Sequence, residues 1–489
     1  MLKKCSHRLK PVPPIALLIV ALNAQTPPST DSIAGRITAN ALRADVSFLA
    51  SDALEGRGTP SRGLDIAAEF IASQFRRAGL EAAGDDGYFQ TAGYAQVIPP
   101  TEGLSLAAEE NGKTVRAAAG TIRFLDAAGA DLAGIPVLHV TLDRPSALES
   151  LTASAARGKA LVIEVPDSGR ALIRRVAEMA RRLEPAIVVV LGTAARGPVQ
   201  AELLRPDSAT APATPCLTVS DAAFRKAATA PGARLSAHIP APKVTGVKLR
   251  NVVGVLRGAD PALRDSYVLV TAHYDHLGIR GSGPGDHIYN GADDDASGTA
   301  SVIEIAEALA GLTERPKRSV VFMTFFGEEL GEVGSRYYVA HPVFPLAKTA
   351  VDLNLEQLGR TDEVGEGVHT GQYNLTGFDF TDLSPVLRQA AQPFGMRVVN
   401  DEKHTDQYFR ASDNYPFADA GVPSTTISVA YQFGDYHQPG DEWPKLDYDN
   451  MAIVDRAVAL GVWEVASNSA APQWNAASPK TEGFRVKRR

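Results

Sequence analysis

Apolar and polar positions along the chain follow two different patterns, which predict helices in some stretches and strands in others. Around residues 37–80 the apolar side chains recur at helical spacing, and Gly79 marks the end of a helix. From residue 85 to 127 the helical signal is weak, and strand-like pieces such as "YAQVIP" and "GTIRFL" take its place. We therefore expect residues 25–127 to form the N-terminal part of a larger domain, helical at first and then strand-like.

A second pattern occupies residues 128–240. Short β-rich runs, among them "IPVLHVTL", "KALVIEV", "AIVVVLG" and "TPCLTVS", surround one amphipathic stretch, "GRALIRRVAEMARRL". Strands interleaved with a single helix predict a small inserted domain of the α+β class, rich in β-structure. The linker "IPAPKVTGVKL" then returns the chain to the larger domain.

Strands and helices alternate from residue 241 to 470. The runs "SYVLVTAHYD", "RSVVFMTFFGEE", "TAVDLNLEQLG" and "VPSTTISVA" predict strands, while "SGTASVIEIAEALAGL" and residues 450–468 predict helices. This alternation indicates an α/β domain of three layers, α/β/α, with a mixed and largely parallel sheet. Residues 471–489 carry a basic excess and are expected to form a loose tail.

The N-terminus has the pattern of an export signal. Four basic residues precede the apolar run at 15–22, and small and polar residues follow around Ala24. The run is shorter than the roughly 20 residues that span a bilayer. We expect a cleaved signal peptide at 1–24, an exported protein in the periplasm or outside the cell, and no membrane span after its removal; an uncleaved anchor is the alternative.

Composition narrows the classes of function. Hydrophobic residues make up 45% and charged residues 21%, as in ordinary globular proteins, and the net charge of -7 argues against nucleic acid as a partner. Removal of the leader takes Cys5 away and leaves Cys216 alone, so no disulfide within the mature chain is expected. Cys216 is then expected to be a buried small apolar residue.

Acidic and histidine side chains gather where the predicted strands end. His273 and Asp275 end one strand, "GADDDASG" opens a helix, Glu328 and Glu329 end another strand, and "NLEQLG" and "DYHQPGDEW" end two more. Ligands collect beyond the carboxyl ends of strands in open α/β sheets, and so many acids at one edge would repel one another without cations. Two divalent ions bridged by a carboxylate would relieve this repulsion, and a nitrogen and oxygen donor set suits zinc, with cobalt or manganese as substitutes.

Two of these groups of residues have a simpler structural interpretation when each is considered alone. Glu328 and Glu329 could lie in an exposed turn, and His273 could be a strand-end histidine satisfied by a nearby acid. His273 and Asp275 are two residues apart in a strand and point to the same side, so that Asp275 could orient the imidazole for a metal.

The motifs "AHYDHLG", "GADDDASG", "GEELGEVGS", "NLEQLGR" and "YHQPGDEW" resemble, in this order, the co-catalytic zinc aminopeptidases of metallopeptidase family twenty-eight in clan MH. The resemblance covers residues 251 to about 470. It extends more weakly to "FLASDALEGRG" and to the inserted unit, which looks like a protease-associated (PA) domain. The resemblance implies two zinc ions and peptide substrates with a free N-terminus.

Roles follow from the resemblance position by position. It implies that Asp294 bridges the two zinc ions, that His273 and Glu356 bind one of them, and that Glu329 and His437 bind the other. The family more often has Asp where Glu356 stands.

The resemblance also implies the catalytic residues. Glu328 becomes the general base, Tyr436 donates a hydrogen bond to the tetrahedral oxyanion, and Asp275 orients His273. It implies a cis bond between Asp294 and Asp295, and a supporting role for Asp413. No role is matched to His276, His287 or His404, which are expected to be exposed or structural.

The sequence thus favours an exported metallo-aminopeptidase. A dipeptidase, a carboxypeptidase or a glutaminyl cyclase on the same scaffold remains as an alternative, and so does a binding protein without catalysis. A carboxypeptidase would need a cationic pocket for the substrate carboxylate, for which Arg360 and Arg410 are the candidates.

Overall fold

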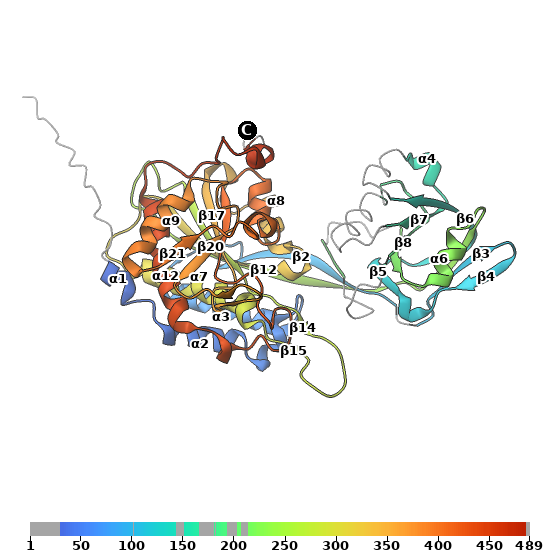
Figure 1. Ribbon diagram of the computed structural model, residues 1–489, viewed down its shortest axis with the longest axis horizontal. Helices are drawn as coiled ribbons and strands as arrows, with labels where there is room; N and C mark the ends of the chain where they lie inside the picture. Colours follow the sequence, from blue (N-terminus) through green and yellow to red (C-terminus); the bar gives the residue numbers. More distant parts are fainter. Residues whose placement is uncertain are drawn as a thin grey trace, which may run out of the picture.

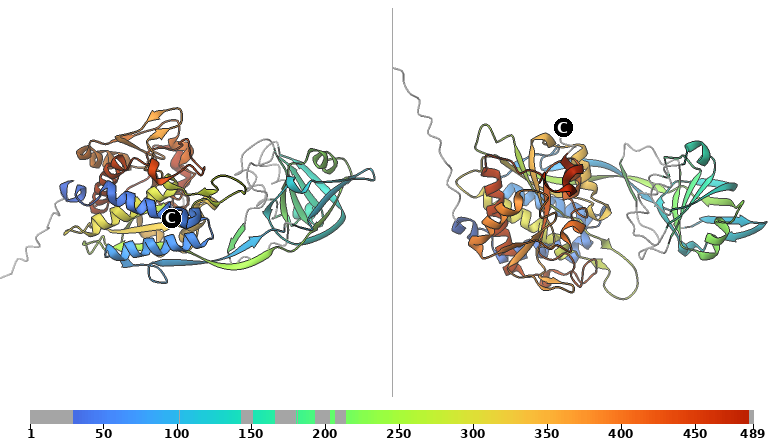
Figure 2. Two further views of the ribbon diagram at one scale, coloured as in Figure 1. Left: turned by 90° about the horizontal axis from the view of Figure 1, so that it is seen from below. Right: turned by 45° about the horizontal axis from the view of Figure 1, so that its top comes forward.

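The computed structural model describes residues 30–485, apart from residues 101, 143–150, 166–179, 181, 193–202 and 207–213. The chain forms a large lobe and a small lobe, which two long strands connect (Figure 1). These strands, β2 (Phe89–Ile98) and β12 (Lys243–Leu256), pair antiparallel, and they bridge the lobes in both views of Figure 2. The predicted signal peptide and most of the helix predicted from "GRALIRRVAEMARRL" lie outside the described residues.

A mixed sheet forms the centre of the large lobe. Its strands follow the order β21-β20-β22-β17-β13-β16-β12-β2-β9, and β1 pairs with β12. The central strands β13, β16 and β17 are buried along their whole length, as expected of strands covered on both faces. The strands not yet located are β1 (Glu81–Ala82), β9 (Leu203–Pro206), β13 (Tyr267–His273), β16 (Ser319–Phe325), β17 (Thr349–Leu355), β20 (Gln372–Leu375), β21 (Arg397–Val399) and β22 (Ser424–Ser428).

The centre of this sheet is parallel, and so is its edge pair, β20 with β21. The strands β16, β13, β17 and β22 run parallel to one another, whereas β12 pairs antiparallel with β16 and β2, and β20 pairs antiparallel with β22. The expected α/β class is confirmed, but the sheet contains more antiparallel pairing than "largely parallel" implied. The reason is the long β2 and β12 pair, which leads the chain out to the small lobe and back.

Helices cover both faces of the sheet and complete three layers. On one face, helices from both ends of the chain share one apolar core with the sheet. They are α2 (Ala39–Leu49), α3 (Arg62–Arg77), α7 (Gly298–Ala310), α9 (Leu383–Ala391) and α12 (Tyr448–Ser467). On the opposite face, α8 (Val333–Ala340) and α11 (Asn414–Asp419) pack over a second core that contains Tyr338, Phe344 and Phe417.

The small lobe is built on a second sheet, of order β4-β3-β11-β6-β7-β8-β10-β5. This sheet begins at Ser105, ahead of the boundary at 128 expected from the sequence, because its first strands pair with distant ones. Cys216 is buried in it, as predicted. The elements are β3 (Ser105–Glu110), β4 (Lys113–Arg116), β5 (Ile122–Asp126), β6 (Ala130–Thr141), α4 (Ala153–Ala156), β7 (Ala160–Glu164), β8 (Ile187–Leu191), β10 (Cys216–Val219), α6 (Ala222–Ala228) and β11 (Arg234–Ile239).

The end of the chain packs against the large lobe. Residues 471–485 were expected to form part of a loose tail, but Trp474 and Phe484 stack at 5.1 Å and are buried beside Phe409. Burial of these apolar rings holds the segment in place. The remaining short elements are α1 (Thr30–Ala34), β14 (Gly278–Ile279), β15 (Ile288–Tyr289), β18 (Asp362–Glu363), β19 (Gly367–Val368), α10 (Thr405–Tyr408) and α13 (Glu482–Arg485). Within the described residues, no helix has the length and apolar character needed to cross a membrane.

Candidate metal centre

The carboxyl ends of the central strands carry the acids and histidines singled out from the sequence. His273 is the last residue of β13, Glu328 and Glu329 begin the short 3₁₀ helix that follows β16, and Glu356 directly follows β17. Asp294 lies in the turn that precedes α7. His437 lies in the loop after β22. The parallel centre of the sheet therefore delivers side chains from five separate segments to one edge.

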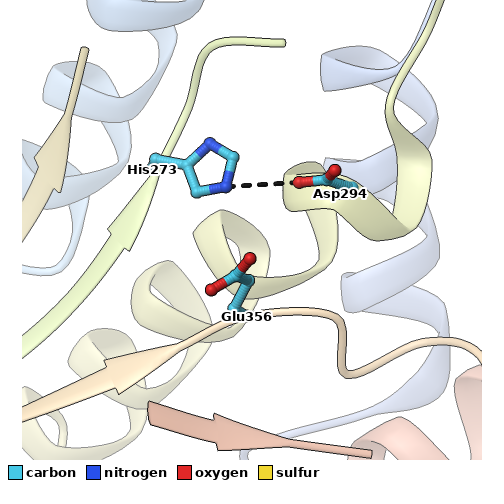
Figure 3. A group of neighbouring side chains, drawn as sticks. All are labelled: His273, Asp294 and Glu356. Atoms are coloured by element: carbon cyan, nitrogen blue, oxygen red, sulfur yellow. Dashed lines mark ion pairs between the residues drawn. The ribbon is translucent and has the colours of Figure 1, made fainter. Parts of the chain in front are cut away.

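Three of these side chains form a first cluster around one oxygen of Asp294. His273 Nε2 lies 3.3 Å from Asp294 Oδ1, and the two are joined by the dashed line in Figure 3. Glu356 completes the group, and one ligand atom from each residue lies within 4.8 Å of the others. The carboxyl group of Glu356 comes from below this pair in the view of Figure 3, from the end of its strand. The arrangement offers one nitrogen and two oxygens to a single cation.

A second cluster forms around the other oxygen of Asp294. His437 Nε2 lies 3.0 Å from Asp294 Oδ2 and 3.3 Å from Glu329 Oε1. His276, to which the sequence gave no role, also enters this cluster, with Nδ1 2.8 Å from the same Glu329 oxygen. The structure thus brings together all five residues predicted as metal ligands and adds a sixth.

The donor atoms of both clusters fit divalent cations. His273 Nε2, both ring nitrogens of His276 and Glu329 Oε1 are buried, and apart from the histidine–carboxylate contacts just given none of these atoms has a hydrogen-bond partner within the described part of the chain. Buried polar atoms are normally satisfied, so these four point to a missing partner. Nitrogen and oxygen donors without sulfur suit zinc, cobalt or manganese. The residues present therefore fit the metals expected from the sequence.

The acids of the site ionise very differently from one another. Burial opposes ionisation of Asp294, but hydrogen bonds from His273 and His437 outweigh it and hold the pKa of Asp294 well below its usual range. Burial and the charge of Asp294 likewise oppose ionisation of Glu329, but His276 and His437 lower its pKa to about 2.

The pKa values of two other carboxyl groups, Glu328 and Glu356, are raised instead of lowered. Burial, followed by repulsion from Glu356 and Glu329, raises the pKa of Glu328 well above its usual range, despite the opposing effect of His273. Burial and the charge of Asp294 also raise the pKa of Glu356 to about 7. Carboxylates this crowded need additional positive charge to ionise together.

Asp275 connects several parts of the site. Its Oδ1 accepts a hydrogen bond of 3.0 Å from the backbone N–H of Glu328, and its Oδ2 accepts one of 3.0 Å from the hydroxyl of Thr59. His273 Nδ1 lies 3.2 Å from the Asp275 carbonyl oxygen and 3.6 Å from its carboxylate. Asp275 is therefore placed to fix the orientation of the imidazole and the position of Glu328 at once.

Three further acids hold the turn that carries Asp294. The carboxylate of Asp441 accepts hydrogen bonds of 3.0–3.1 Å from the backbone N–H groups of Asp293 and Asp294. Asp293 and Asp295 in turn accept hydrogen bonds from the backbone after β17, at Gly359 and at Gln357. Sequence reasoning missed Asp441, although it lies in the quoted motif "YHQPGDEW". The peptide bond between Asp294 and Asp295 is cis, as expected.

The N-terminal stretch "FLASDALEGRG" also reaches the site, through the fully buried Arg57. The guanidinium of Arg57 donates hydrogen bonds to the carbonyl groups of Leu49, Tyr274, Asn290 and Gly291. Burial lowers the pKa of Arg57 to about 10, although several neighbouring acids favour its charge. The segments that carry His273, His276 and Asp294 are thereby joined by one side chain.

Tyr436 borders a small cavity beside Glu356. Its ring stacks on the ring of His437, with the centroids 4.0 Å apart. The cavity has a volume of about 70 Å³. It is lined by Glu356, Gln357, Thr376, Tyr408, Ala411, Ser412, Thr426, Ser428, Tyr431 and Tyr436. Burial raises the pKa of Tyr436 well above its usual range, so its hydroxyl remains a hydrogen-bond donor.

Asp413 lies buried beside the site and accepts a hydrogen bond from Ser335. Burial raises its pKa to about 7. Two of the histidines without a matched role lie elsewhere: His287 Nε2 faces the carbonyl of Gly283 at 2.9 Å, and His404 Nδ1 faces Asp401 at 2.7 Å.

Arg360 and Arg410, which were considered as binders of a substrate carboxylate, already contact other side chains. Arg360 forms ion pairs with Asp362 at 2.7 Å and Asp435 at 3.0 Å. Arg410 lies over the rings of Tyr415 and Phe484.

Part of this chain is similar to known peptidases. Residues 251–462 match the family described as peptidase family M28. A probable zinc metalloprotease of Pyrenophora tritici-repentis is 25% identical over 270 residues, 46% of this chain and 59% of that protein. Aminopeptidase YwaD of Bacillus subtilis is 25% identical over 234 residues, 46% of each chain. The chain thus spans about half the length of these relatives. The solved aminopeptidase from Aneurinibacillus sp. strain AM-1 shares the fold at a TM-score of 0.61 and 16% identity, over 91% of this chain and 97% of that one.

Proposed function

Because residues 251–462 form a peptidase family M28 domain, we propose that the protein is a metallo-aminopeptidase that removes N-terminal residues from peptides. The observation that carries this proposal is the position of Asp294, whose two carboxylate oxygens face two different ligand groups. A carboxylate placed in this way can bridge two divalent cations. The names of the relatives, a zinc metalloprotease and an aminopeptidase, are consistent with it.

The proposed occupants are two zinc ions, for which cobalt or manganese could substitute. His273 and Glu356 would hold one ion, Glu329 and His437 would hold the other, and Asp294 would contribute to both. When bound, the metals supply Lewis-acid polarisation of the scissile carbonyl and lower the pKa of a water molecule. Shielding of the crowded carboxylates by the cations also explains how so many acids can lie together.

Glu328 is the proposed general base. Its backbone N–H is held by the hydrogen bond to Asp275. Its carboxyl group is not among the proposed metal ligands and so can take up a proton. After the attack of water on the carbonyl carbon, Glu328 returns that proton to the leaving amine. Tyr436 stabilises the oxyanion of the tetrahedral intermediate by donating a hydrogen bond from its hydroxyl.

The surroundings of Glu356 favour recognition of an N-terminus over a C-terminus. A substrate carboxylate would need a free cationic partner, but Arg360 is engaged with Asp362 and Asp435. The carboxyl group of Glu356 beside the cavity can instead accept a hydrogen bond from an α-ammonium group. The cavity beside Glu356 holds the side chain of the first residue. Its volume of about 70 Å³ and its hydroxyl-rich lining suit an uncharged side chain of small to medium size.

The test is a panel of aminoacyl-anilides, their N-acetylated counterparts, and dipeptides with a free or blocked C-terminus. The proposal predicts about two zinc ions per chain and hydrolysis only of substrates with a free amine. Cleavage that depends on a free carboxylate would contradict it and assign the protein to the carboxypeptidases. Absence of any turnover in a zinc-loaded protein would favour the binding-protein alternative.

The proposal includes export. The basic residues and apolar run ahead of Ala24 support a signal peptide at 1–24. Expression in a bacterial host followed by mass spectrometry of the periplasmic protein would locate the mature N-terminus, and an intact Met1 on protein retained in the cell would refute it.

The small lobe is proposed to act as a PA-like domain that limits the length of accepted substrates. Its sheet is separate from the sheet that carries the metal centre, so its loss should leave short substrates unaffected. A variant in which a two-residue turn joins Ile98 directly to Lys243, which are paired in the structure, would test this on short and long peptides. Unchanged discrimination by length would count against a gating role.

A further inference from the structure

His276 is buried inside the metal centre although no motif assigned it there. It follows β13 by three residues, and its side chain is 0% exposed, whereas that of His437 is 37% exposed. Buried histidines normally use their ring nitrogens in hydrogen bonds. Apart from the contacts of Nδ1 with the carboxylates of Glu329 and Asp294, neither nitrogen of His276 has such a partner among the described residues. Both nitrogens thus lack the backbone or neutral side-chain partner that would hold a structural histidine.

Its Nδ1 atom points at the second cluster. This atom lies 2.8 Å from Glu329 Oε1 and 3.8 Å from Asp294 Oδ2. His437 Nε2 lies 3.3 Å and 3.0 Å from the same two oxygens. Two imidazole rings thus converge on one pair of carboxylate oxygens, with the ring centroids 5.7 Å apart in an edge-to-face arrangement.

The ring of His276 cannot easily turn away from this position. A Cβ atom added to Gly291 would lie 2.3 Å from the ring carbon Cγ, so the ring packs directly against the backbone there. The backbone N–H of His276 donates a hydrogen bond to the Arg57 carbonyl, and the Arg57 guanidinium holds the Gly291 carbonyl. Arg57 therefore fixes the wall behind the ring through its side chain and the segment that carries the ring through its backbone carbonyl.

We propose that His276 is a protein ligand of the second cation, together with Asp294, Glu329 and His437. This inference rests on the two-metal centre of the proposed function. The inference goes beyond that function, because it gives the two cation positions different numbers of protein ligands. The second position has four protein ligands, two nitrogens and two oxygens, which is the number that closes a tetrahedral zinc site.

The first cation position then has an open coordination site. His273, Glu356 and Asp294 supply only three protein ligands there, which leaves one coordination position free, as in catalytic zinc sites. Because four protein ligands surround the second cation and three surround the first, the second cation is the one expected to be held more tightly.

The experiment measures metal binding independently of turnover. The purified protein, its His276→Ala and His276→Gln variants, and a His238→Ala control in the small lobe are freed of metal and titrated with zinc against a chromophoric chelator. Outer-shell partners of metal ligands change affinity by about 10–100-fold, so loss of a direct ligand should weaken one of the two sites by at least about tenfold. The control should bind two zinc ions as the wild type does. Wild-type affinity at both sites in both His276 variants would overturn the proposal.

A second measurement uses the unaltered protein, in case the variants fail to fold. In the wild type labelled with ¹⁵N-histidine, ring-nitrogen resonances that shift on zinc binding report coordinated imidazoles. The proposal predicts three such histidines, namely His273, His276 and His437. Two shifted histidines, with His276 in the doubly protonated form of an ion pair with Glu329, would overturn it. Neither readout depends on which peptides are cleaved, so a failed aminopeptidase assay leaves this inference to be judged separately.

Discussion

Replacement of Asp275 tests how far the residues around the ligands control the metals. Asp275→Asn keeps an oxygen that can accept the hydrogen bond from the Glu328 N–H, but it removes the negative charge 3.6 Å from His273 Nδ1. Asp275→Ala removes both acceptors and also leaves the hydroxyl of Thr59 without its partner. The two variants therefore separate the effect of charge from the effect of the hydrogen bonds.

The expected magnitudes follow from these contacts. Loss of a partner behind a metal-bound histidine weakens the metal by about 10–100-fold. Since zinc stabilises the folded state by RT ln(1 + [Zn]/Kd), the stabilisation by zinc should fall by about 1.4–2.7 kcal/mol in the Asn variant. The Ala variant should in addition lose about 1–3 kcal/mol of its free energy of unfolding both with zinc and with chelator, because the Glu328 N–H is left without an acceptor in either state.

The assay is denaturant unfolding of each protein with excess zinc and with excess chelator, and the difference between the two free energies of unfolding is compared. Asp286→Asn is the matched control and should behave as the wild type, because Asp286 is exposed and its carboxylate accepts a hydrogen bond from the nearby Ile288 N–H. If both Asp275 variants gain as much stability from zinc as the wild type and the Asp286→Asn control do, Asp275 does not support the metal through His273.

Three further outcomes are expected. Glu328→Gln should lower kcat by about 10²–10⁴-fold while retaining zinc, and near-normal turnover would exclude Glu328 as the base. Tyr436→Phe should lower kcat by about 10²–10³-fold with little change in KM, and an effect on KM alone would assign Tyr436 to substrate binding instead. Burial raises the pKa of Asp455 to about 8, above its unfolded value of 3.8, so the wild type loses stability as pH rises between these values. Asp455→Asn should therefore be more stable than the wild type in denaturant unfolding at pH 7 and equal to it near pH 4; a less stable variant at pH 7 would contradict this.

The sequence predicted the large lobe well where the signal is local. Buried parallel strands have unbroken apolar sequences, so "SYVLVTAH" and "SVVFMTFF" could be recognised as strands without knowledge of their partner strands. The residues that follow such runs reach one edge of the sheet by topology alone. The residues predicted as metal ligands could therefore be gathered from motifs, and the structure places them together around Asp294.

Features that depend on distant contacts were missed. His276 lies beyond the end of its strand, so its direction is set by Gly291 and by Arg57, which no local pattern reveals. Asp441 acts through backbone N–H groups far away in the sequence. The start of the small lobe at Ser105 depends on pairing with a strand more than a hundred residues later, and the packing of the chain end depends on Trp474 meeting Phe484. A second histidine three residues after His273 was the one local signal that could have suggested His276.

The contacts of Arg57 also bear on the order in which the protein assembles. This guanidinium joins carbonyl groups that lie 217 and 233 residues further along the chain, with the whole small lobe between them. Contacts of such long range form late, since the entropy of closing a large loop must be overcome first. The small lobe has its own sheet and core and can fold while the two halves of the large lobe are still apart. The metal centre is then among the last parts of the molecule to form, and cations added at the start of refolding should accelerate only its final phase.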